Sequence, residues 1–302
     1  MITDKLIDGI IGMQNPTCVG LDTLFDYLPD DMKAGVTTFE GVAERVFDFN
    51  KKIIDNVYDI VPSVKVPIAY YEMYGVAGMK AYEETLKYAT EKGLVVIADA
   101  KRNDIGSTAS CYAKTFLGET KVNDLSLKAF PADYVTVNGY LGTDGIAPFV
   151  DECEKNEKGI FVLVKTSNPS SGELQNLMLE NGKPVYEYMG ELVEKWGEST
   201  IGEYGYSAVG AVVGATHPTE AALLRKALPH TFFLIPGYGA QGGNAEMLKS
   251  CFGANGLGGV VNNSRGILTA YKKNGGTYYE AARKASIAMQ QDLSNTIGVM
   301  KK

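Results

Sequence analysis

Eight short apolar runs rich in β-branched residues constrain the fold of this sequence more than any other feature. They occupy residues 17–22, 60–66, 94–101, 132–138, 159–166, 207–214, 231–237 and 256–265. Their apolar residues are largely continuous instead of alternating with polar ones, which is typical of strands buried on both faces of a parallel sheet. We therefore predict a buried parallel sheet in which each run forms one strand.

Amphipathic stretches of helical length separate these runs. In residues 39–57, for example, apolar residues recur at spacings of three to four, as on one face of a helix. Eight strands alternating with helices predict an α/β fold, a (β/α)8 TIM barrel in a single domain spanning residues 1–302. The extended segment at about residues 167–206 is expected to add a short element. An open doubly wound sheet is the alternative, because it shows the same alternation.

The composition is that of an ordinary globular protein, with 45% hydrophobic and 22% charged residues. The 29 basic and 36 acidic residues leave a net charge of −7, so no broad basic surface is expected and nucleic acid is not a predicted partner. No stretch approaches ~18 consecutive apolar residues, the length that a membrane-spanning helix needs. We therefore expect no membrane partner.

Histidine and cysteine are scarce, which narrows the possible chemistry. Two histidines and four scattered cysteines without a CxxC motif cannot build a rich metal site. Cys18, Cys111, Cys153 and Cys251 are interpreted as buried, reduced residues. The N-terminal residues do not resemble a signal peptide, so a cytoplasmic location is expected.

Polar residues end several of the apolar runs. The first run ends at Asp22, the second carries Lys65 near its end, and the fifth is followed by Ser167. In a TIM barrel, the active site lies at the carboxyl ends of the strands. Charges there are costly unless they are paired, so structural ion pairs are one explanation. Polar groups at five strand ends favour a functional site instead.

The densest polar cluster is DAKRNDI, residues 99–105. Because residues two apart in a strand share a face, Asp99 and Lys101 are expected to point the same way, with Asp104 on the loop beyond. Flanking carboxylates favour the ammonium form of Lys101, which suits a proton donor better than a Schiff-base nucleophile. A salt-bridge network that closes the barrel mouth is an equally open explanation from composition alone.

The glycine-rich segment GYGAQG at residues 237–242 matches GxGxxG, but we do not interpret it as a dinucleotide site. A Rossmann fingerprint needs an acidic residue ~20 positions later, whereas the next strand ends in Asn262, Asn263 and Arg265. The last two strand-to-helix loops of a TIM barrel often bind phosphate through backbone N–H groups and a charged side chain. We predict such a site at this loop and Arg265, with an ordinary tight turn as the alternative.

Together these residues resemble the orotidine 5′-phosphate decarboxylase family. The D-x-K-x-x-D-I element of residues 99–105 is similar to the family signature, although related barrel enzymes that act on phosphosugars share D-x-K-x-x-D. The resemblance spans nearly the whole chain. Within the family, the sequence is similar to the longer bacterial, type 2-like subgroup. The other matching motifs are VGLD ending at Asp22, a strand-two lysine at Lys65, KTSNP at 165–169, PGYGAQGG at 236–243 and VNNSRGI at 261–267.

The resemblance implies an activity and a role for each of these residues. Members of the family convert orotidine 5′-monophosphate to UMP and CO₂, and the resemblance implies neither a cofactor nor a metal. Lys101 would stabilise and protonate the carbanion at ring carbon C6, Asp99 would lie near the departing carboxylate, and Lys65 would hold this row in register. The resemblance also implies the substrate contacts. Asp22 would contact the ribose, and Ser167 and Gln241 would contact the pyrimidine amide. The phosphate would be bound by Arg265, Pro236, Gly239 and the loop backbone.

The resemblance also implies a homodimer. In such a dimer, Asp104, Ile105 and Thr108 would reach into the partner's site, Asp104 as a catalytic residue. One departure from the family pattern follows the strand-two lysine, where many relatives carry an amide residue and this sequence has Val66 and Pro67. That difference leaves the ribose contacts at this point open.

Two other functions are compatible with parts of the sequence. One is a metal-dependent barrel lyase that acts on a phosphosugar keto-acid, with Asp99 among the metal ligands. The other is a nucleotide-binding protein without activity. The full row of Asp99, Lys101 and Asp104 disfavours the second, because an inactive binder has no use for so costly an arrangement of charges.

Overall fold

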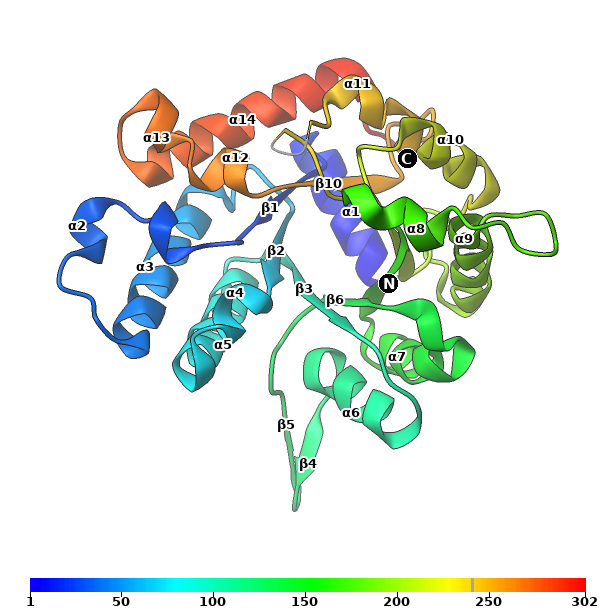
Figure 1. The fold of residues 1–302 in the computed structure, drawn as a ribbon, viewed down its shortest axis with the longest axis horizontal. Helices are drawn as coiled ribbons and strands as arrows, with labels where there is room; N and C mark the ends of the chain where they lie inside the picture. The colour runs from blue at the N-terminus through cyan, green and yellow to red at the C-terminus, as the bar shows by residue number, and fades with distance from the viewer. Residues whose placement is uncertain (240–241) are drawn as a thin grey trace.

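A closed barrel of parallel strands forms the centre of the molecule (Figure 1). The computed structural model describes residues 1–239 and 242–302, and within them eight strands form the barrel. The first strand pairs with both the second and the last, which closes the sheet. The TIM barrel is therefore confirmed, and the open doubly wound sheet is wrong. The barrel strands are β1 (Thr17–Gly20), β2 (Ser63–Pro67), β3 (Val95–Arg102), β6 (Tyr134–Val137), β7 (Gly159–Lys165), β8 (Val209–Val213), β9 (Phe233–Ile235) and β10 (Gly259–Asn263).

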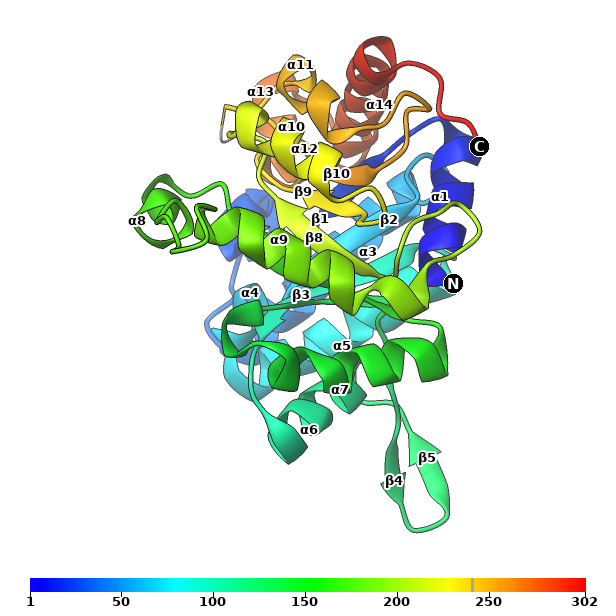
Figure 2. The ribbon, with the colours of Figure 1, turned by 90° about the vertical axis from the view of Figure 1, so that its right-hand side faces the viewer.

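Helices follow each barrel strand and surround the barrel (Figures 1 and 2). The N-cap of the long helix after β1 is Thr38, whose hydroxyl accepts the N–H of Gly41 (3.1 Å). The longer helices are α1 (Ile2–Met13), α3 (Phe39–Val57), α5 (Gly75–Glu91), α6 (Gly106–Leu117), α7 (Thr143–Asn156), α9 (Val185–Trp196), α10 (Pro218–Ala227) and α14 (Tyr278–Ile297). The short helices are η1 (Phe25–Tyr27), α2 (Asp30–Lys33), α4 (Ala69–Glu72), η2 (Gly139–Leu141), η3 (Pro169–Ser171), α8 (Gly172–Gln175), η4 (Glu198–Thr200), α11 (Ala245–Leu248), η5 (Lys249–Cys251), α12 (Arg265–Leu268) and α13 (Tyr271–Asn274).

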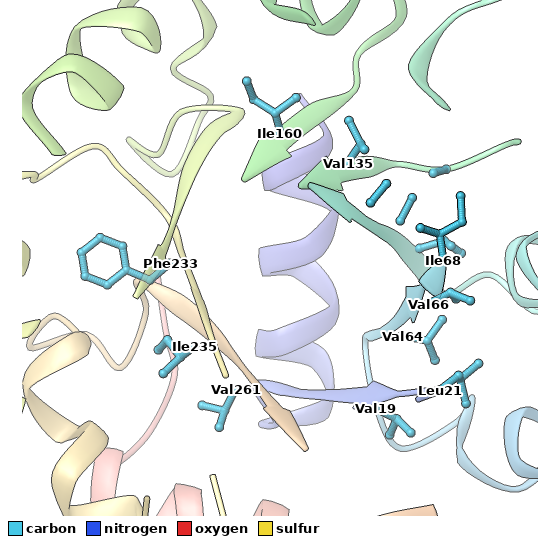
Figure 3. Packing of buried hydrophobic residues seen from close by; sticks show 14 of the residues in the cluster. Val19, Leu21, Val64, Val66, Ile68, Val135, Ile160, Phe233, Ile235 and Val261 are labelled. Carbon is cyan, nitrogen blue, oxygen red and sulfur yellow. The ribbon is translucent and has the colours of Figure 1, made fainter. Parts of the chain in front are cut away.

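The larger hydrophobic core lies between the barrel and its helices. Side chains on the strands, among them Val19, Val64 and Val261, belong to this cluster (Figure 3). From α3, Phe49 and Ile53 pack into the same cluster and are fully buried. Because alternate strand residues face the helices and the barrel interior, both faces must be apolar, which explains the continuous apolar runs.

A second core fills the barrel interior and is closed by α1. Leu6, Ile7 and Ile10 of this helix are buried with interior residues such as Val95 and Val260. Figure 2 shows α1 at the end of the molecule opposite α8. The helix therefore covers the amino ends of the strands and leaves their carboxyl ends for a site.

Two excursions depart from the regular alternation. The extended segment between β7 and β8 contains η3 and α8 before its main helix α9. A hairpin between α6 and β6, which the sequence analysis did not predict, projects from the barrel (Figures 1 and 2). Its strands are β4 (Thr120–Val122) and β5 (Leu125–Leu127).

Three of the four cysteines are buried as predicted. Cys111 on α6 is exposed, so the prediction of burial is wrong for it. Within the described residues, no helix combines the length and apolar character that a membrane crossing requires.

Candidate active site

A cavity of about 680 Å³ opens at the carboxyl ends of the barrel strands. Each barrel strand or the residues directly after it contribute to the lining, including Asp22 after β1, Lys65 of β2 and Asn262 of β10. This is the end of the barrel at which active sites of the fold are found. A concave space of this size suits a small organic ligand.

The floor of the cavity carries a row of alternating charges. The ammonium of Lys65 lies 3.1 Å from Asp22 Oδ1 and 3.1 Å from Asp99 Oδ2. The ammonium of Lys101 lies 2.6 Å from Asp99 Oδ1. Asp22, which follows β1, and residues of β2 and β3 thus form one connected row. The predicted meeting of Asp99 with Lys101 is present in the structure.

Burial and charge act in opposite directions on this row. Burial alone would raise the pKa of Asp99, but the charges of Lys65 and Lys101 outweigh it and hold the pKa well below the usual carboxyl range. Burial would lower the pKa of Lys65, yet the charges of Asp22 and Asp99 raise it above the ordinary lysine value. Asp99 and Lys65 therefore both stay charged near neutral pH.

A backbone irregularity in β3 presents Lys101 to the cavity. The register of β3 with β6 shifts between Ala98 and Arg102, and Lys101 has a left-handed backbone conformation (φ 48°). Thr136 of β6 supports it: its hydroxyl accepts the N–H of Lys101 (2.9 Å) and donates to Asp99 Oδ1 (2.8 Å). Left-handed conformations of residues other than glycine carry strain, and such strain is often found at functional sites.

The far wall of the cavity comes from the ends of β7, β9 and β10. Ser167, Pro236 and Arg265, which are predicted from the sequence to contact substrate, line this wall. Gly20 leaves room for the side chain of Ser264, because a methyl group on Gly20 would lie 2.0 Å from the Ser264 hydroxyl oxygen. The missing side chain thus gives space to the polar side chains of Ser264 and Asp22 at this end of the barrel.

The glycine-rich loop is described in part. Gly239 has a left-handed conformation (φ 73°), and its N–H donates to the carbonyl of Gly243 (2.7 Å). Gly239 is not among the residues that line the cavity, although Gly237 and Tyr238 are. Gln241 lies outside the described residues.

Asp104, Ile105 and Thr108 lie apart from the lining of the cavity. They follow β3 on the loop and the first turns of α6. Asp104 Oδ1 accepts the N–H of Ile105 (2.8 Å), and the side chain of Ile105 is 55% exposed. Within a single chain, the structure therefore does not bring these residues to the row of charges.

Several lining residues were missed by the sequence analysis. Tyr27, Tyr70, Thr136 and Gln175 contribute to the cavity. A polar residue inside the buried run YVTV signals Thr136, since an isolated threonine in such a strand needs a partner. Gln175 has no comparable signal, because it lies in the extended segment, whose path the sequence did not predict.

A closed (β/α)8 barrel with a charged cavity at the carboxyl ends of its strands defines a TIM-barrel enzyme. Residues 17–275 match the family described as Orotidine 5′-phosphate decarboxylase / HUMPS, and the chain belongs to this family. The resemblance seen in the sequence is thereby confirmed.

Two curated relatives and one solved structure illustrate the likeness. The orotidine 5′-phosphate decarboxylase of Clostridium acetobutylicum is 44% identical to this chain, over 98% of this chain and 100% of the relative. That of Clostridium botulinum is 45% identical, over 97% of this chain and 99% of the relative. The structure of Leishmania donovani OMP decarboxylase is 27% identical, with a TM-score of 0.74 over 97% of each chain.

Proposed function

We propose that this chain converts orotidine 5′-monophosphate to UMP and CO₂. The observation that carries the proposal is the row of Asp22, Lys65, Asp99 and Lys101 on the floor of the cavity. Membership of the decarboxylase family and the names of relatives that match almost the whole chain support the same activity.

The row of charges suits a reaction that creates a carbanion. Loss of CO₂ breaks the bond between ring carbon C6 and the carboxylate and leaves the electron pair on C6. The ammonium of Lys101 stabilises this pair and then donates a proton to it, which gives UMP. Asp99, held ionised by Lys65 and Lys101, repels the substrate carboxylate and favours its departure.

The remaining contacts divide the substrate among the walls of the cavity. Asp22 binds the ribose hydroxyls, and Ser167 with Gln241 binds the pyrimidine amide. Arg265 binds the phosphate together with Pro236, Gly239 and the loop backbone. Support comes from the positions of Asp22, Ser167, Pro236 and Arg265 in the lining. Binding energy from the remote phosphate can be used to accelerate the chemical step.

We also propose how the chain assembles and where in the cell it acts. Residues 1–302 form one barrel domain, which acts as a cytoplasmic homodimer. Asp104, Ile105 and Thr108 extend from one subunit into the site of the other, with Asp104 completing the row of charges. The position of Asp104 three residues after Lys101, and the exposure of Ile105, support this arrangement.

The direct test is to add orotidine 5′-monophosphate to the purified protein and follow the loss of its ultraviolet absorbance. We expect turnover that is unchanged by EDTA. Absence of turnover would refute the activity. Loss of turnover on EDTA treatment, restored by an added divalent metal, would refute the cofactor-free chemistry.

The shared site can be tested by mixing two inactive variants, Lys101→Ala and Asp104→Ala. If Asp104 acts across the interface, a mixed dimer contains one site with both residues native, and activity returns on mixing. About a quarter of wild-type activity is the statistical expectation, because half of the dimers are mixed and each has one intact site of two. A mixture as inactive as its components would show that Asp104 does not act in the partner's site.

A further inference from the structure

The end of β7 is held by a side chain from the extended segment. The N–H of Thr166, the residue after β7, donates to Gln175 Oε1 (3.0 Å). The amide Nε2 of Gln175 donates in turn to the hydroxyl of Thr166 (2.7 Å), and that hydroxyl donates to Asn168 Oδ1 (2.6 Å). One amide therefore satisfies both the backbone and the side chain of Thr166 where the strand ladder ends.

The end of β8 packs against the other side of residues 165–167. The N–H of Gly214 donates to the carbonyl of Lys165 (2.7 Å). A methyl group on Gly214 would lie 2.8 Å from both the backbone nitrogen and Cβ of Ser167. Ser167 thus lies directly against the end of β8 on one side, and on the other it follows a residue whose orientation Gln175 sets.

The short helix that carries Gln175 is itself anchored to β7. Lys165 is fully buried, and its ammonium donates to Asn176 Oδ1 (2.7 Å) and lies 5.3 Å from the centre of the Tyr186 ring. Lys165 therefore faces α8 and α9 and is not among the residues that line the cavity. The extended segment is fastened to β7 through two consecutive pairs, Lys165 with Asn176 and Thr166 with Gln175.

We infer that Gln175 is a positioning residue for Ser167 and thereby sets how the site recognises the pyrimidine base. This inference rests on the proposed function, in which Ser167 binds the pyrimidine amide. Gln175 acts through the backbone of Thr166: with its amide absent, the Thr166 N–H loses its acceptor, and the next residue can rotate out of its binding orientation. The extended segment consequently contributes to specificity for the base and not to the charged row.

The test is Gln175→Met, which keeps the side-chain length but removes both hydrogen-bonding groups. We expect the affinity for UMP and the reciprocal of KM for orotidine 5′-monophosphate to fall about tenfold, because binding of the base must then restore the orientation of Ser167 that Gln175 holds in the free protein. Affinity for ribose 5-phosphate, which lacks the base, should not change, and kcat should fall less than twofold. Gln175→Glu, which retains an acceptor for the Thr166 N–H, should recover part of the UMP affinity.

Two controls separate positioning from general damage. Glu173→Gln changes an exposed residue of the same short helix and should bind UMP like the wild type. In a Ser167→Ala background, Gln175→Met should have no further effect on UMP affinity, because the residue that it positions is gone.

Three outcomes would overturn the inference. They are an unchanged UMP affinity in Gln175→Met, an equal loss of affinity for ribose 5-phosphate, or full additivity with Ser167→Ala. A wild-type protein that neither binds UMP nor turns over the substrate would refute the proposed function itself, which is a different result.

Discussion

Lys65 connects the two halves of the charged row. Its side chain is 6% exposed and lies between the carboxylates of Asp22 and Asp99. Without this cation, the two carboxylates would face each other at the strand ends with less opposing charge, and they would repel each other. At the scale of single residues, Lys65 thus keeps Asp99 charged, while Lys101, whose side chain is 54% exposed, is accessible to a ligand.

Replacing Lys101 with alanine should separate chemistry from binding. We expect kcat to fall at least about a thousandfold, because both the stabilising charge and the proton donor are lost. Affinity for UMP should stay within about tenfold of the wild type, since the phosphate and base contacts remain. Lys155→Ala, at an exposed position on α7, is the control. Near-normal turnover of Lys101→Ala in the absorbance assay would remove Lys101 from the mechanism.

Replacing Arg265 with alanine should affect the phosphate selectively. A lost charge-assisted contact is worth about 1.5–3 kcal/mol, so UMP affinity should fall about ten- to a hundredfold. Affinity for uridine, which lacks the phosphate, should stay the same. Calorimetric titration with both ligands measures the difference, and Arg45→Ala on α3 is the control. Equal losses for UMP and uridine would contradict the assignment.

At the scale of elements, the site depends on how β3 is joined to β6. The register shift between these strands leaves Lys101 in a left-handed conformation beside Thr136. The threonine hydroxyl accepts a backbone bond from β3 and donates to Asp99. The same side chain therefore stabilises an irregular strand and orients a charged residue.

Thr136→Val should disturb both functions of this hydroxyl. The change keeps the shape of the side chain but leaves the Lys101 N–H unpaired, at a cost of about 1–3 kcal/mol in the free energy of unfolding. We also expect kcat to fall by about tenfold, because Asp99 loses a donor that orients it. Thr136→Ser, which keeps the hydroxyl, is the matched control. Denaturant unfolding and the absorbance assay test both effects, and a valine variant with wild-type stability and turnover would rule out this role.

At the scale of the whole molecule, the low pKa of Asp99 links the site to acid stability. Because the folded state holds the pKa of Asp99 below that of the unfolded chain, the stabilisation from this carboxylate is complete above about pH 5 and is lost as the pH falls further. The pKa of Lys65 is shifted in the opposite direction, above that of the unfolded chain. The stabilisation of the folded state from Lys65 is therefore complete below about pH 10, and it does not change in the acid range.

Acid unfolding should therefore depend on Asp99. We expect the wild-type free energy of unfolding to decrease between pH 5 and 2.5, and the decrease to be shallower in Asp99→Asn. Denaturant titrations at each pH measure this, and two protein concentrations would reveal any contribution from subunit dissociation. Identical pH slopes for the two proteins would show that Asp99 does not titrate differently on folding.

Much of the architecture could be predicted because burial on both faces of a strand leaves a visible pattern. Each apolar run overlaps one barrel strand, and polar residues at or near the ends of several runs, such as Asp22, Lys65 and Lys101, line the cavity. The hairpin and Gln175 could not be predicted in this way. The hairpin strands are short and exposed, and Gln175 is positioned by a segment without periodicity.

The sequence by itself determined the alternation of eight strands with helices and the kinds of side chain at the strand ends. It could do so because strand periodicity and the cost of buried charge are local properties. Only the tertiary structure decided which of those groups meet. Lys65 bridges Asp22 and Asp99, which lie 43 and 34 positions away in the chain, because closure of the sheet brings β1, β2 and β3 side by side. The conformation of Lys101 was decided in the same way, since its strained backbone is stabilised by a hydroxyl from a neighbouring strand.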